Sequence, residues 1–568
     1  MSQDERQAHG GAQAVAAAQR HGVQALFTLS GGHIFPVYDG AVRADPPMPI
    51  VDVRHEQTAV FAAEAMSRLT RTPGFAVLTA GPGVTNGVSA VTTAQFNGSP
   101  LVVLAGRAPD GRWGSGSLQE LDHPPLLAPV TKRAWTVHLP GQVGTATDEA
   151  FALASSRHRG PVFLDASLEA LYGTGSLAGA ETQPPATGAS GRDGADGPAM
   201  RHQPDPDSIT AIARLLADAS RPVLILGSDV WLDGAEHAAR SAAEELRLPV
   251  IANGQGRGIL PAGHPLLVTR ARSVALGEAD LVLVAGTPLD FRLGYGSFGG
   301  KNGTPPARVV HLADSPELIA THCQLAGSAA GELAAIFSGL ADAAGNGTAD
   351  SAAWTQDWLP RLQAISKQAT ADDTALLASN ANPVHPLRIY GELASLLAED
   401  AVIIGDGGDF VSYAGKYVEP QQPGGWLDPG PYGCLGTGLG YAIAARLARP
   451  TAQVVLLLGD GAAGFSLMDA DTLVRHGLPV VMVCGNNGIW GLEKHPMQAL
   501  YGYDVAADLQ PGCRYDQVVT ALGGGGELVT DPADIGPALR RAFDSGIPYL
   551  VNVVTDPSDA YPRSTTGV

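Results

Sequence analysis

Cysteine, positive charge and long apolar runs are all scarce in this chain. Its 568 residues include four cysteines, and no two of them form a C-x-x-C pair, so neither a zinc site nor a disulfide framework is indicated. Lysine and arginine number 36 against 56 acidic residues, and the net charge of −20 argues against nucleic acid as a partner. The start of the chain lacks the layout of a signal peptide, and no apolar run approaches the ~20 residues that span a bilayer. We therefore expect a cytoplasmic protein without a membrane partner.

Shifts in composition divide the chain into three blocks. Hydrophobic residues make up 45% of the sequence, as in a buried α/β enzyme, and 568 residues are too many for one core. Two stretches without a regular apolar period are predicted as linkers, and the second of them is expected to carry one amphipathic helix around Trp354–Ile365. The predicted organisation is a first domain at 1–175, a linker at 176–206, a central domain at 207–342, a linker at 343–383, a third domain at 384–555 and a tail at 556–568.

Each block alternates short apolar runs with helix-like stretches, which is typical of βαβ units. The predicted fold class is therefore α/β, with three doubly wound parallel-sheet domains. Most of the apolar runs end in Gly, Asp or Asn, and ligands of such sheets bind at the carboxyl ends of the strands. The predicted strands are 27–30, 75–80, 101–106 and 161–166 in the first domain, 222–227, 249–253, 281–286 and 308–314 in the second, and 401–408, 454–461, 480–487 and 549–555 in the third.

Two strand ends in the third domain carry oxygen-bearing side chains. One strand runs into Gly-Asp460-Gly461, and the next runs into Gly-Asn-Asn487-Gly. The interval of 27 residues (487 − 460) is long enough for a crossover helix between adjacent parallel strands, so the two side chains should emerge side by side. Such oxygens suit Mg²⁺, and the open backbone N–H groups of Gly461 and Ala462 at a helix start favour an anion. Either turn alone would usually be only a strand-end turn.

This pair of motifs resembles the signature of the thiamine-diphosphate-dependent decarboxylase and lyase family. The resemblance covers essentially the whole chain and implies pyrimidine-binding, central nucleotide-type and diphosphate-binding domains, in that order. It implies that Asp460, Asn487 and the backbone carbonyl of Ile489 bind Mg²⁺. It also implies that Leu435 lies under the thiazolium ring and that the carbonyl of Gly433 holds the 4′-amino group, although Leu435 could be an ordinary core residue. The other residues expected to contact the cofactor are Gly83, Asn86, Gly407, Gly408, Gly461 and Ala462.

Glu56 stands at a strand-to-helix junction in the first domain. A buried carboxylate with a raised pKa, placed against N1′ of the aminopyrimidine, promotes loss of the cofactor's C2 proton. The resemblance implies this role for Glu56; the alternative is a helix-start glutamate favoured by the helix dipole. Because the family places the cofactor between the first domain of one subunit and the third domain of another, the resemblance implies a homodimer or homotetramer with the active site at the subunit interface.

Three further side chains bear on the substrate. His33 could hydrogen-bond a substrate hydroxyl or carbonyl, or it could be only a helix-start histidine. Gln119 matches a position where relatives keep a glutamine that faces the thiazolium. Glu493 follows the metal motif closely enough to take a proton from a substrate hydroxyl, unless it is a surface glutamate beside Lys494.

The segment after Asn487, Gly-Ile-Trp-Gly-Leu-Glu-Lys-His, resembles the 2-hydroxyacyl-CoA lyase and oxalyl-CoA decarboxylase branch of the family. The resemblance is greatest to actinobacterial lyases of short 2-hydroxyacyl-CoA thioesters of the 2-hydroxyisobutyryl-CoA kind. It implies an acyl-CoA substrate that is cleaved to formyl-CoA and a ketone or aldehyde. Acetolactate synthase and oxalyl-CoA decarboxylase are alternatives. A non-catalytic regulatory relative is a further one, which the intact Glu56, Asp460 and Asn487 argue against.

The central domain carries residues suited to a nucleotide. An arginine suits phosphate and an acid at a strand end suits ribose hydroxyls, and the resemblance implies an ADP site with Arg159, Arg272, Asp290 and Asp314. FAD, which acetolactate synthases hold in the equivalent domain, is not expected, and an empty site is the third alternative. In the CoA-using relatives the tail closes over the substrate entrance, so we expect the tail to do so here and Arg563 to be available for a CoA phosphate.

Overall fold

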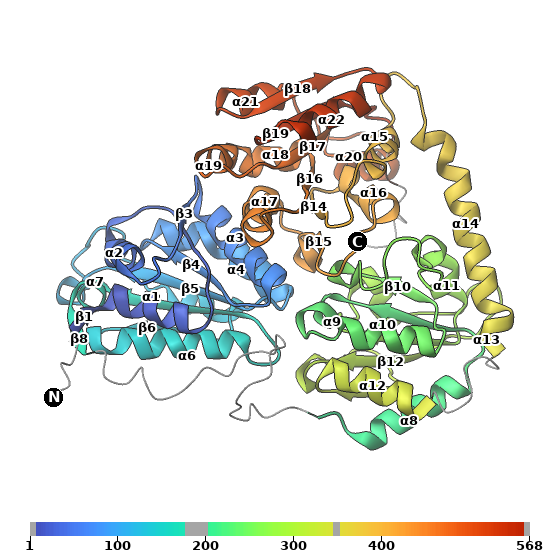
Figure 1. Cartoon of the computed structure of the whole chain (residues 1–568), viewed down its shortest axis with the longest axis horizontal. Helices are drawn as coiled ribbons and strands as arrows, with labels where there is room; N and C mark the ends of the chain where they lie inside the picture. Colours follow the sequence, from blue (N-terminus) through green and yellow to red (C-terminus); the bar gives the residue numbers. More distant parts are fainter. Residues whose placement is uncertain (1–6, 177–202, 345–352, 560, 562–568) are drawn as a thin grey trace.

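The computed structural model describes residues 7–176, 203–344, 353–559 and 561. Three large β-sheets with helices on their faces lie in these residues (Figure 1), and all neighbouring strands within them are parallel. The predicted α/β class with three parallel sheets is confirmed. Most of the predicted linker at 176–206 and of the predicted tail, with Arg563, lies outside the described residues.

The first sheet has the strand order β3-β2-β4-β5-β7-β6. Its strands are β2 (Leu26–Thr28), β3 (Ile50–Asp52), β4 (Gly74–Leu78), β5 (Leu101–Arg107), β6 (Ala134–Val137) and β7 (Pro161–Ser167), and its helices are α1 (Gly10–Arg20), α2 (Phe35–Arg43), α3 (Glu56–Thr70), α4 (Pro82–Phe96), α5 (Pro124–Leu127), α6 (Val143–Ser155) and α7 (Leu168–Tyr172). A short antiparallel pair of β1 (Gln7–His9) and β8 (Thr174–Ser176) joins the two ends of this domain. Strands β5 and β7 are buried at every residue, which explains their nearly continuous apolar runs.

The second sheet has five strands in the order β10-β9-β11-β12-β13. Its strands are β9 (Pro222–Leu226), β10 (Val250–Ala252), β11 (Leu281–Ala285), β12 (Arg308–Ala313) and β13 (Gly327–Ala330), and its helices are α8 (Pro206–Ala217), α9 (Ser228–Leu232), α10 (Glu236–Glu245), α11 (Arg272–Glu278) and α12 (Leu333–Ala344). The helix expected around Trp354–Ile365 is present as α13 (Ala353–Gln356) and the longer α14 (Trp358–Leu377). Helix α14 runs along the side of the molecule from the second sheet to the third (Figure 1).

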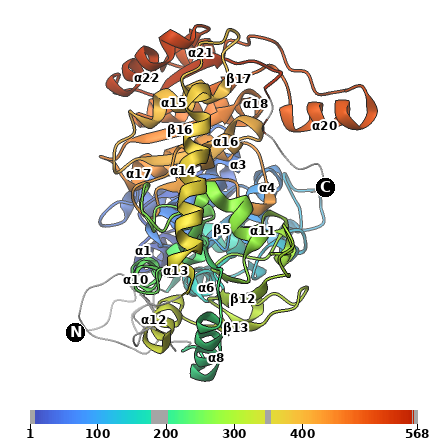
Figure 2. The same cartoon turned by 90° about the vertical axis from the view of Figure 1, so that its right-hand side faces the viewer.

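The third sheet has the order β15-β14-β16-β17-β19-β18. Its strands are β14 (Val402–Asp406), β15 (Trp426–Leu427), β16 (Val454–Gly459), β17 (Val481–Asn486), β18 (Gly525–Val529) and β19 (Tyr549–Val554), and its helices are α15 (Pro386–Ala394), α16 (Asp409–Tyr417), α17 (Thr437–Ala448), α18 (Asp460–Ser466), α19 (Ala470–Arg475), α20 (Gly491–Tyr501), α21 (Tyr515–Ala521) and α22 (Ile535–Asp544). Helix α20 projects from the body of this domain (Figure 2). None of the helices in the described ranges is long and apolar enough to cross a bilayer.

Every predicted strand is present, and β3 is the strand of the junction predicted before Glu56. Four strands of the large sheets were missed, namely β6, β13, β15 and β18, and each of them lies at an edge of its sheet. An edge strand pairs on one side only and is partly exposed, so it need not be a continuous apolar run. The apolar pattern therefore found the interior of each sheet and the edge strand β10, but it missed four other edge strands, of which β15 is buried and only 2 residues long.

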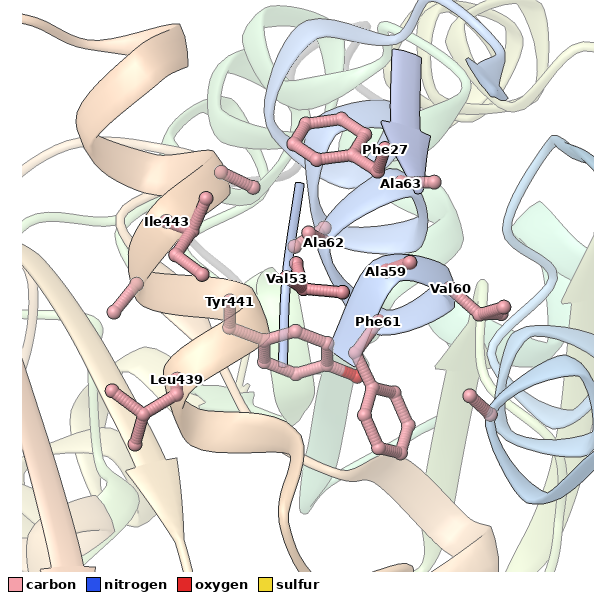
Figure 3. Close-up of a cluster of buried hydrophobic side chains, with 14 of the residues drawn as sticks. Phe27, Val53, Ala59, Val60, Phe61, Ala62, Ala63, Leu439, Tyr441 and Ile443 are labelled. Atoms are coloured by element: carbon pink, nitrogen blue, oxygen red, sulfur yellow. The ribbon is translucent and has the colours of Figure 1, made fainter. Parts of the chain in front are cut away.

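The first and third domains share one hydrophobic core, because α3 packs against α17 (Figure 3). The rings of Phe61 and Tyr441 meet edge to face, with centroids 5.9 Å apart. Gly440 allows this approach, since a Cβ there would lie 2.8 Å from the Cβ of Phe61. Beneath the rings, Tyr441 Oη donates to Oε2 of buried Glu64 at 2.8 Å, and Arg68 Nη1 donates to the same hydroxyl at 3.2 Å. The two domains that carry the predicted cofactor residues are thus one packed unit.

Candidate active site

The two strand-end motifs of the third domain meet. Strands β16 and β17 are neighbours in the sheet, with Gly459 opposite Gly485. Asp460 follows β16, and its Oδ2 accepts the backbone N–H of Gly488 at 2.6 Å. Asn487 follows β17, and its Oδ1 accepts the N–H of Ile489 at 3.1 Å. The 27-residue interval therefore brings Asp460 and the Asn487 turn to one edge of the sheet.

A third strand end, that of β14, completes this edge. Gly407 has a φ of +140°, and a Cβ there would approach the backbone nitrogen of Gly459 to 3.2 Å. Asp406 is buried beside it and accepts the N–H groups of Gly436 at 3.0 Å and Gly438 at 2.8 Å. Burial raises the pKa of Asp406 to about 6. Asp406 thus ties the loop that carries Gly433 and Leu435 to the sheet, a contact that sequence reasoning missed although the acid stands at a predicted strand end.

Glu56 lies buried in the first turn of α3. Its Oε2 accepts a hydrogen bond from Asn86 Nδ2 at 2.9 Å, and a Cβ on Gly83 would lie 3.7 Å from its Oε1. The next residue, Gln57, donates to the backbone carbonyl of Leu435 at 3.3 Å. The structure therefore gathers three of the predicted cofactor residues at the start of α3 and α4 and links them to the third domain.

His33 and Gln119 lie together at the turn that leads into α4. His33 Nδ1 lies 3.1 Å from Thr79 Oγ1, and burial lowers the pKa of this imidazole. Gln119 has a φ of +60°, and a Cβ on Gly81 would lie 2.9 Å from its Cβ. Their predicted substrate roles stay predictions, but the structure brings both next to the helix that carries Asn86.

Glu493 lies exposed in the first turn of α20. The neighbouring Lys494 pairs with Asp504 at 3.1 Å and with Asp508 at 2.5 Å, and no partner of the Glu493 carboxylate is found among the described residues. Glu493 is thus an exposed glutamate beside Lys494, as the alternative describes, and its role as a base stays a prediction. Trp490, just before this helix, covers Gly461 so closely that a Cβ there would overlap the indole ring.

The four residues predicted for ADP form two separate groups. Arg159 and Asp314 bond to each other at 3.2 Å. Asp290 pairs with Arg292 at 2.7 Å, and Arg272 donates to the carbonyl of Arg292 at 3.1 Å. Burial lowers the pKa of Arg272 to about 10, and no acidic partner of Arg272 is found in the described part of the chain. Nucleotide binding at these residues stays a prediction.

The first group belongs to a charged cluster between the first and second domains. Ligand-type atoms of His158, Asp229 and Asp314 lie within 4.8 Å of one another, an arrangement that in other surroundings could hold a metal ion. Here His158 and Arg159 both pair with Asp314, so side chains of the chain itself already offset the charge of that carboxylate. We therefore interpret it as an ion-pair network that joins the two domains.

Three family models match the chain in the order of its sheets. They are the thiamine pyrophosphate enzyme N-terminal TPP binding domain over residues 8–126, the central domain over 209–340 and the C-terminal TPP binding domain over 406–553. The chain is 50% identical over 546 residues to a probable acetolactate synthase of Mycobacterium bovis and to the acetolactate synthase large subunit IlvG of Mycobacterium tuberculosis, with 95% of each chain covered. It is 33% identical over 589 residues to 2-hydroxyacyl-CoA lyase 2 of Homo sapiens, with 97% of this chain and 90% of that protein covered.

The chain belongs to the thiamine pyrophosphate enzyme family. The predicted resemblance and the prediction of a thiamine-diphosphate-dependent enzyme that acts on carbon–carbon bonds are confirmed. In this thiamine pyrophosphate enzyme, Glu56 lies in the N-terminal cofactor-binding domain, and Asp460 and Asn487 lie in the C-terminal one.

The third-domain edge of this thiamine pyrophosphate enzyme fits a divalent cation with a bound diphosphate. Asp460 is 4% exposed, and its two oxygens accept only backbone N–H groups, those of Gly461 at 2.9 Å and Gly488 at 2.6 Å. No side-chain cation pairs with it in the described ranges, and burial raises the pKa of this carboxyl to about 6. A buried carboxylate without a counter-charge is costly, and Mg²⁺ would remove that cost. Buried Asn486 Oδ1 and Thr437 Oγ1 also find no hydrogen-bond partner in the part of the chain that the structure describes, so this edge has unused polar atoms.

Proposed function

We propose that this thiamine pyrophosphate enzyme is a 2-hydroxyacyl-CoA lyase. It would cleave a short or branched 2-hydroxyacyl-CoA, such as 2-hydroxyisobutyryl-CoA, reversibly to a ketone or aldehyde and formyl-CoA. The observation that carries the proposal is Glu493: an exposed carboxylate with no ion-pair partner among the described residues, in the first turn of α20, shortly after the Asp460–Asn487 edge. Cleavage of a 2-hydroxyacyl substrate needs a base for the hydroxyl proton, whereas a 2-oxo acid such as pyruvate has no such proton to lose.

The residues divide the work as follows in this proposal. When bound, thiamine diphosphate supplies the nucleophilic carbon and the electron sink that cleavage beside a carbonyl requires. Glu56, oriented by Asn86, holds and returns a proton at the aminopyrimidine N1′. Glu493 takes the proton of the 2-hydroxyl group as the C1–C2 bond breaks, so that the hydroxyl carbon leaves as a carbonyl. His33 and Gln119 bind substrate oxygens.

The metal and the assembly belong to the same proposal. Asp460, Asn487 and the backbone carbonyl of Ile489 would hold Mg²⁺ against the diphosphate. Within one chain the first domain already packs on the third through α3 and α17, and the proposal adds a second contact. Two copies of the chain would complete each active site, the first domain of one facing the third domain of the other, in a homodimer or homotetramer. Glu56 and Asp460 would then act on one cofactor from two subunits.

Product analysis tests the proposal directly. Purified protein with thiamine diphosphate and Mg²⁺ is given 2-hydroxyisobutyryl-CoA or pyruvate, and acetone, formyl-CoA with its hydrolysis product formate, and acetolactate are quantified. We expect acetone and formyl-CoA in equal amounts from the thioester. Acetolactate from pyruvate, with no cleavage of the thioester, would overturn the lyase assignment.

The variant Glu493→Gln tests the proposed base. The amide keeps the size of the side chain but cannot accept the hydroxyl proton, so we expect kcat for thioester cleavage to fall by roughly 10²-fold or more while thiamine diphosphate binding is unchanged. Glu399→Gln, at an exposed glutamate before β14, is the matched control and should keep the wild-type rate. An unchanged rate in Glu493→Gln would remove this residue from its role.

Acetolactate synthesis from pyruvate is the second candidate function. It is favoured by the 50% identity to two proteins that carry that name. A purified protein that is yellow from bound FAD and that forms acetolactate from pyruvate alone would establish it.

A further inference from the structure

A fully buried histidine–aspartate pair lies beneath the turn that begins α4. His123 and Asp165 are both 0% exposed, and His123 Nδ1 lies 2.8 Å from Asp165 Oδ2. On the other side of the ring, the backbone N–H of Gly81 donates to His123 Nε2 at 2.9 Å. Because a backbone N–H can only donate, Nε2 must be the acceptor, so the ring proton sits on Nδ1 and is donated to Asp165. The pair therefore specifies one tautomer and one ring orientation.

The sheet itself holds the aspartate of this pair. Asp165 lies in β7 next to β5, which ends with Arg107. Arg107 Nη1 donates to the same Asp165 oxygen at 3.2 Å and to Asp122 at 3.0 Å, and its guanidinium lies 3.8 Å from the centre of the Trp113 ring. A loop histidine is thus anchored by two strands of the first sheet.

The turn at Gly81, to which His123 is hydrogen-bonded, lies next to several of the predicted site residues. Gly81 has a φ of +59°, a conformation that favours glycine, and Gln119 packs against it. The helix that starts there carries Asn86, whose amide donates to Glu56. A shift of this turn would therefore move the partner of Glu56 and the support of Gln119 together.

We propose that His123 is a positioning residue of this thiamine pyrophosphate enzyme: as the acceptor for the Gly81 N–H, it fixes the turn from which Asn86 orients Glu56 and against which Gln119 packs. The proposal assumes only that the enzyme uses thiamine diphosphate, and it does not depend on whether the substrate is a 2-hydroxyacyl-CoA. It differs from an ordinary buried polar pair because its hydrogen bond ends on the turn that supports the proton-transfer group.

Two variants break this arrangement in different ways. His123→Leu removes the acceptor, leaves the Gly81 N–H unpaired and leaves Asp165 with Arg107 as its remaining partner. Asp165→Asn keeps the volume of the side chain, but the asparagine amide can donate to His123 Nδ1. The ring proton then moves to Nε2, where it faces the Gly81 N–H, so two donors oppose each other. His123→Gln restores an acceptor for Gly81 and serves as the rescue.

The readout is the rate of C2 proton–deuterium exchange in bound thiamine diphosphate, followed by NMR, together with the cofactor Kd from calorimetry. We expect both breaking variants to slow the exchange and to lower kcat by roughly 10- to 100-fold, with KM within about threefold of wild type, since small misplacements at a reacting centre cost that much. His123→Gln should recover most of the loss.

The matched control is His311→Gln in the second domain. His311 is also buried, it accepts the Ala320 N–H at Nδ1, and its Nε2 lies 3.1 Å from the Thr287 carbonyl. We expect this variant to lower the melting temperature and to leave the exchange rate within about twofold. Wild-type exchange and kcat in cofactor-loaded Asp165→Asn would overturn the proposal, even if His123→Leu fails to fold, because the pair would then serve stability alone.

Discussion

At the residue scale, two buried carboxylates of the candidate active site have different surroundings. Glu56 has a side-chain partner, Asn86, and stands in the first turn of α3, where the helix dipole favours negative charge. Asp460 has only backbone N–H partners among the described residues, and its pKa is raised to about 6 by burial. The first arrangement suits a group that holds and returns a proton, and the second suits a ligand that a cation completes.

The variant Glu56→Gln separates these roles. Glutamine fills the same space in the first turn of α3 but cannot exchange a proton as a carboxyl group does, so we expect kcat to fall by roughly 10²-fold or more. The melting temperature should stay close to that of the wild type. Steady-state rates and thermal unfolding measure the two effects, and Glu245→Gln, at an exposed position that ends α10, is the control. A normal turnover in Glu56→Gln would contradict the assignment of Glu56.

At the scale of elements, the pair of α3 and α17 decides how the first and third domains meet. The two helices approach closely because Gly440 has no side chain, and Glu64, Arg68 and Tyr441 bond to one another beneath the contact. Buried charged groups are tolerated only when they are paired and hydrogen-bonded, so this contact has little freedom to rearrange.

Gly440→Ala tests the closeness of this packing. The added Cβ would lie 2.8 Å from the Cβ of Phe61 and 3.0 Å from the carbonyl of Thr58, so one helix must shift. We expect a loss of about 1–3 kcal/mol in the free energy of unfolding, more than the gain of about 1 kcal/mol from replacing a helical glycine. Chemical denaturation of the cofactor-free protein measures it.

Gly464→Ala in α18 is the matched control, because a Cβ there meets nothing within 4 Å. Alanine has the same higher helix propensity than glycine at this position but causes no steric clash, so we expect the free energy of unfolding to be unchanged or slightly higher than in the wild type. Equal effects of the two substitutions would contradict the close packing of α3 and α17.

At the scale of the whole molecule, the first and second domains are joined by the charged cluster around Asp229. The charged groups that face this carboxyl are His158, Arg159, Asp233 and Asp314. Burial raises the pKa of Asp229 from 3.8 to about 7, because the charged form has lost its contact with water. The folded protein thus binds this proton more tightly than the unfolded chain does. The stability that Asp229 contributes is fully present below pH 3.8 and is lost as the pH rises through about 7.

The variant Asp229→Asn removes this dependence. We expect its melting temperature to exceed that of the wild type at pH 8, where the wild-type carboxyl is charged and buried, and the difference to shrink toward pH 5. Thermal unfolding across pH 5–8 measures it, with Asp218→Asn, at an exposed aspartate, as a control whose difference should be flat. A difference that does not change with pH would show that burial of the Asp229 charge does not govern this contact.

The sequence by itself determined the interior of each sheet and the meeting of Asp460 with the Asn487 turn. Both follow from local rules: strands buried on both faces are continuous apolar runs, and adjacent parallel strands end at the same edge. The edge strands β6, β13 and β18 escaped these rules because they are partly exposed, and β15 escaped them because it is only 2 residues long.

Only the tertiary structure decided which side chains became partners over long distances. Three such contacts depend on the path of loops, which a periodic sequence pattern does not predict. They are the hydrogen bonds of Asp406 at the start of α17, the hydrogen bond from Gly81 to His123, and the ion pairs of Lys494 with Asp504 and Asp508. A histidine in a loop and an aspartate in a strand 42 residues later carry no mutual signal in the sequence. Their role arises because parallel strands bring β5 and β7 together under a turn that itself holds the partner of Glu56.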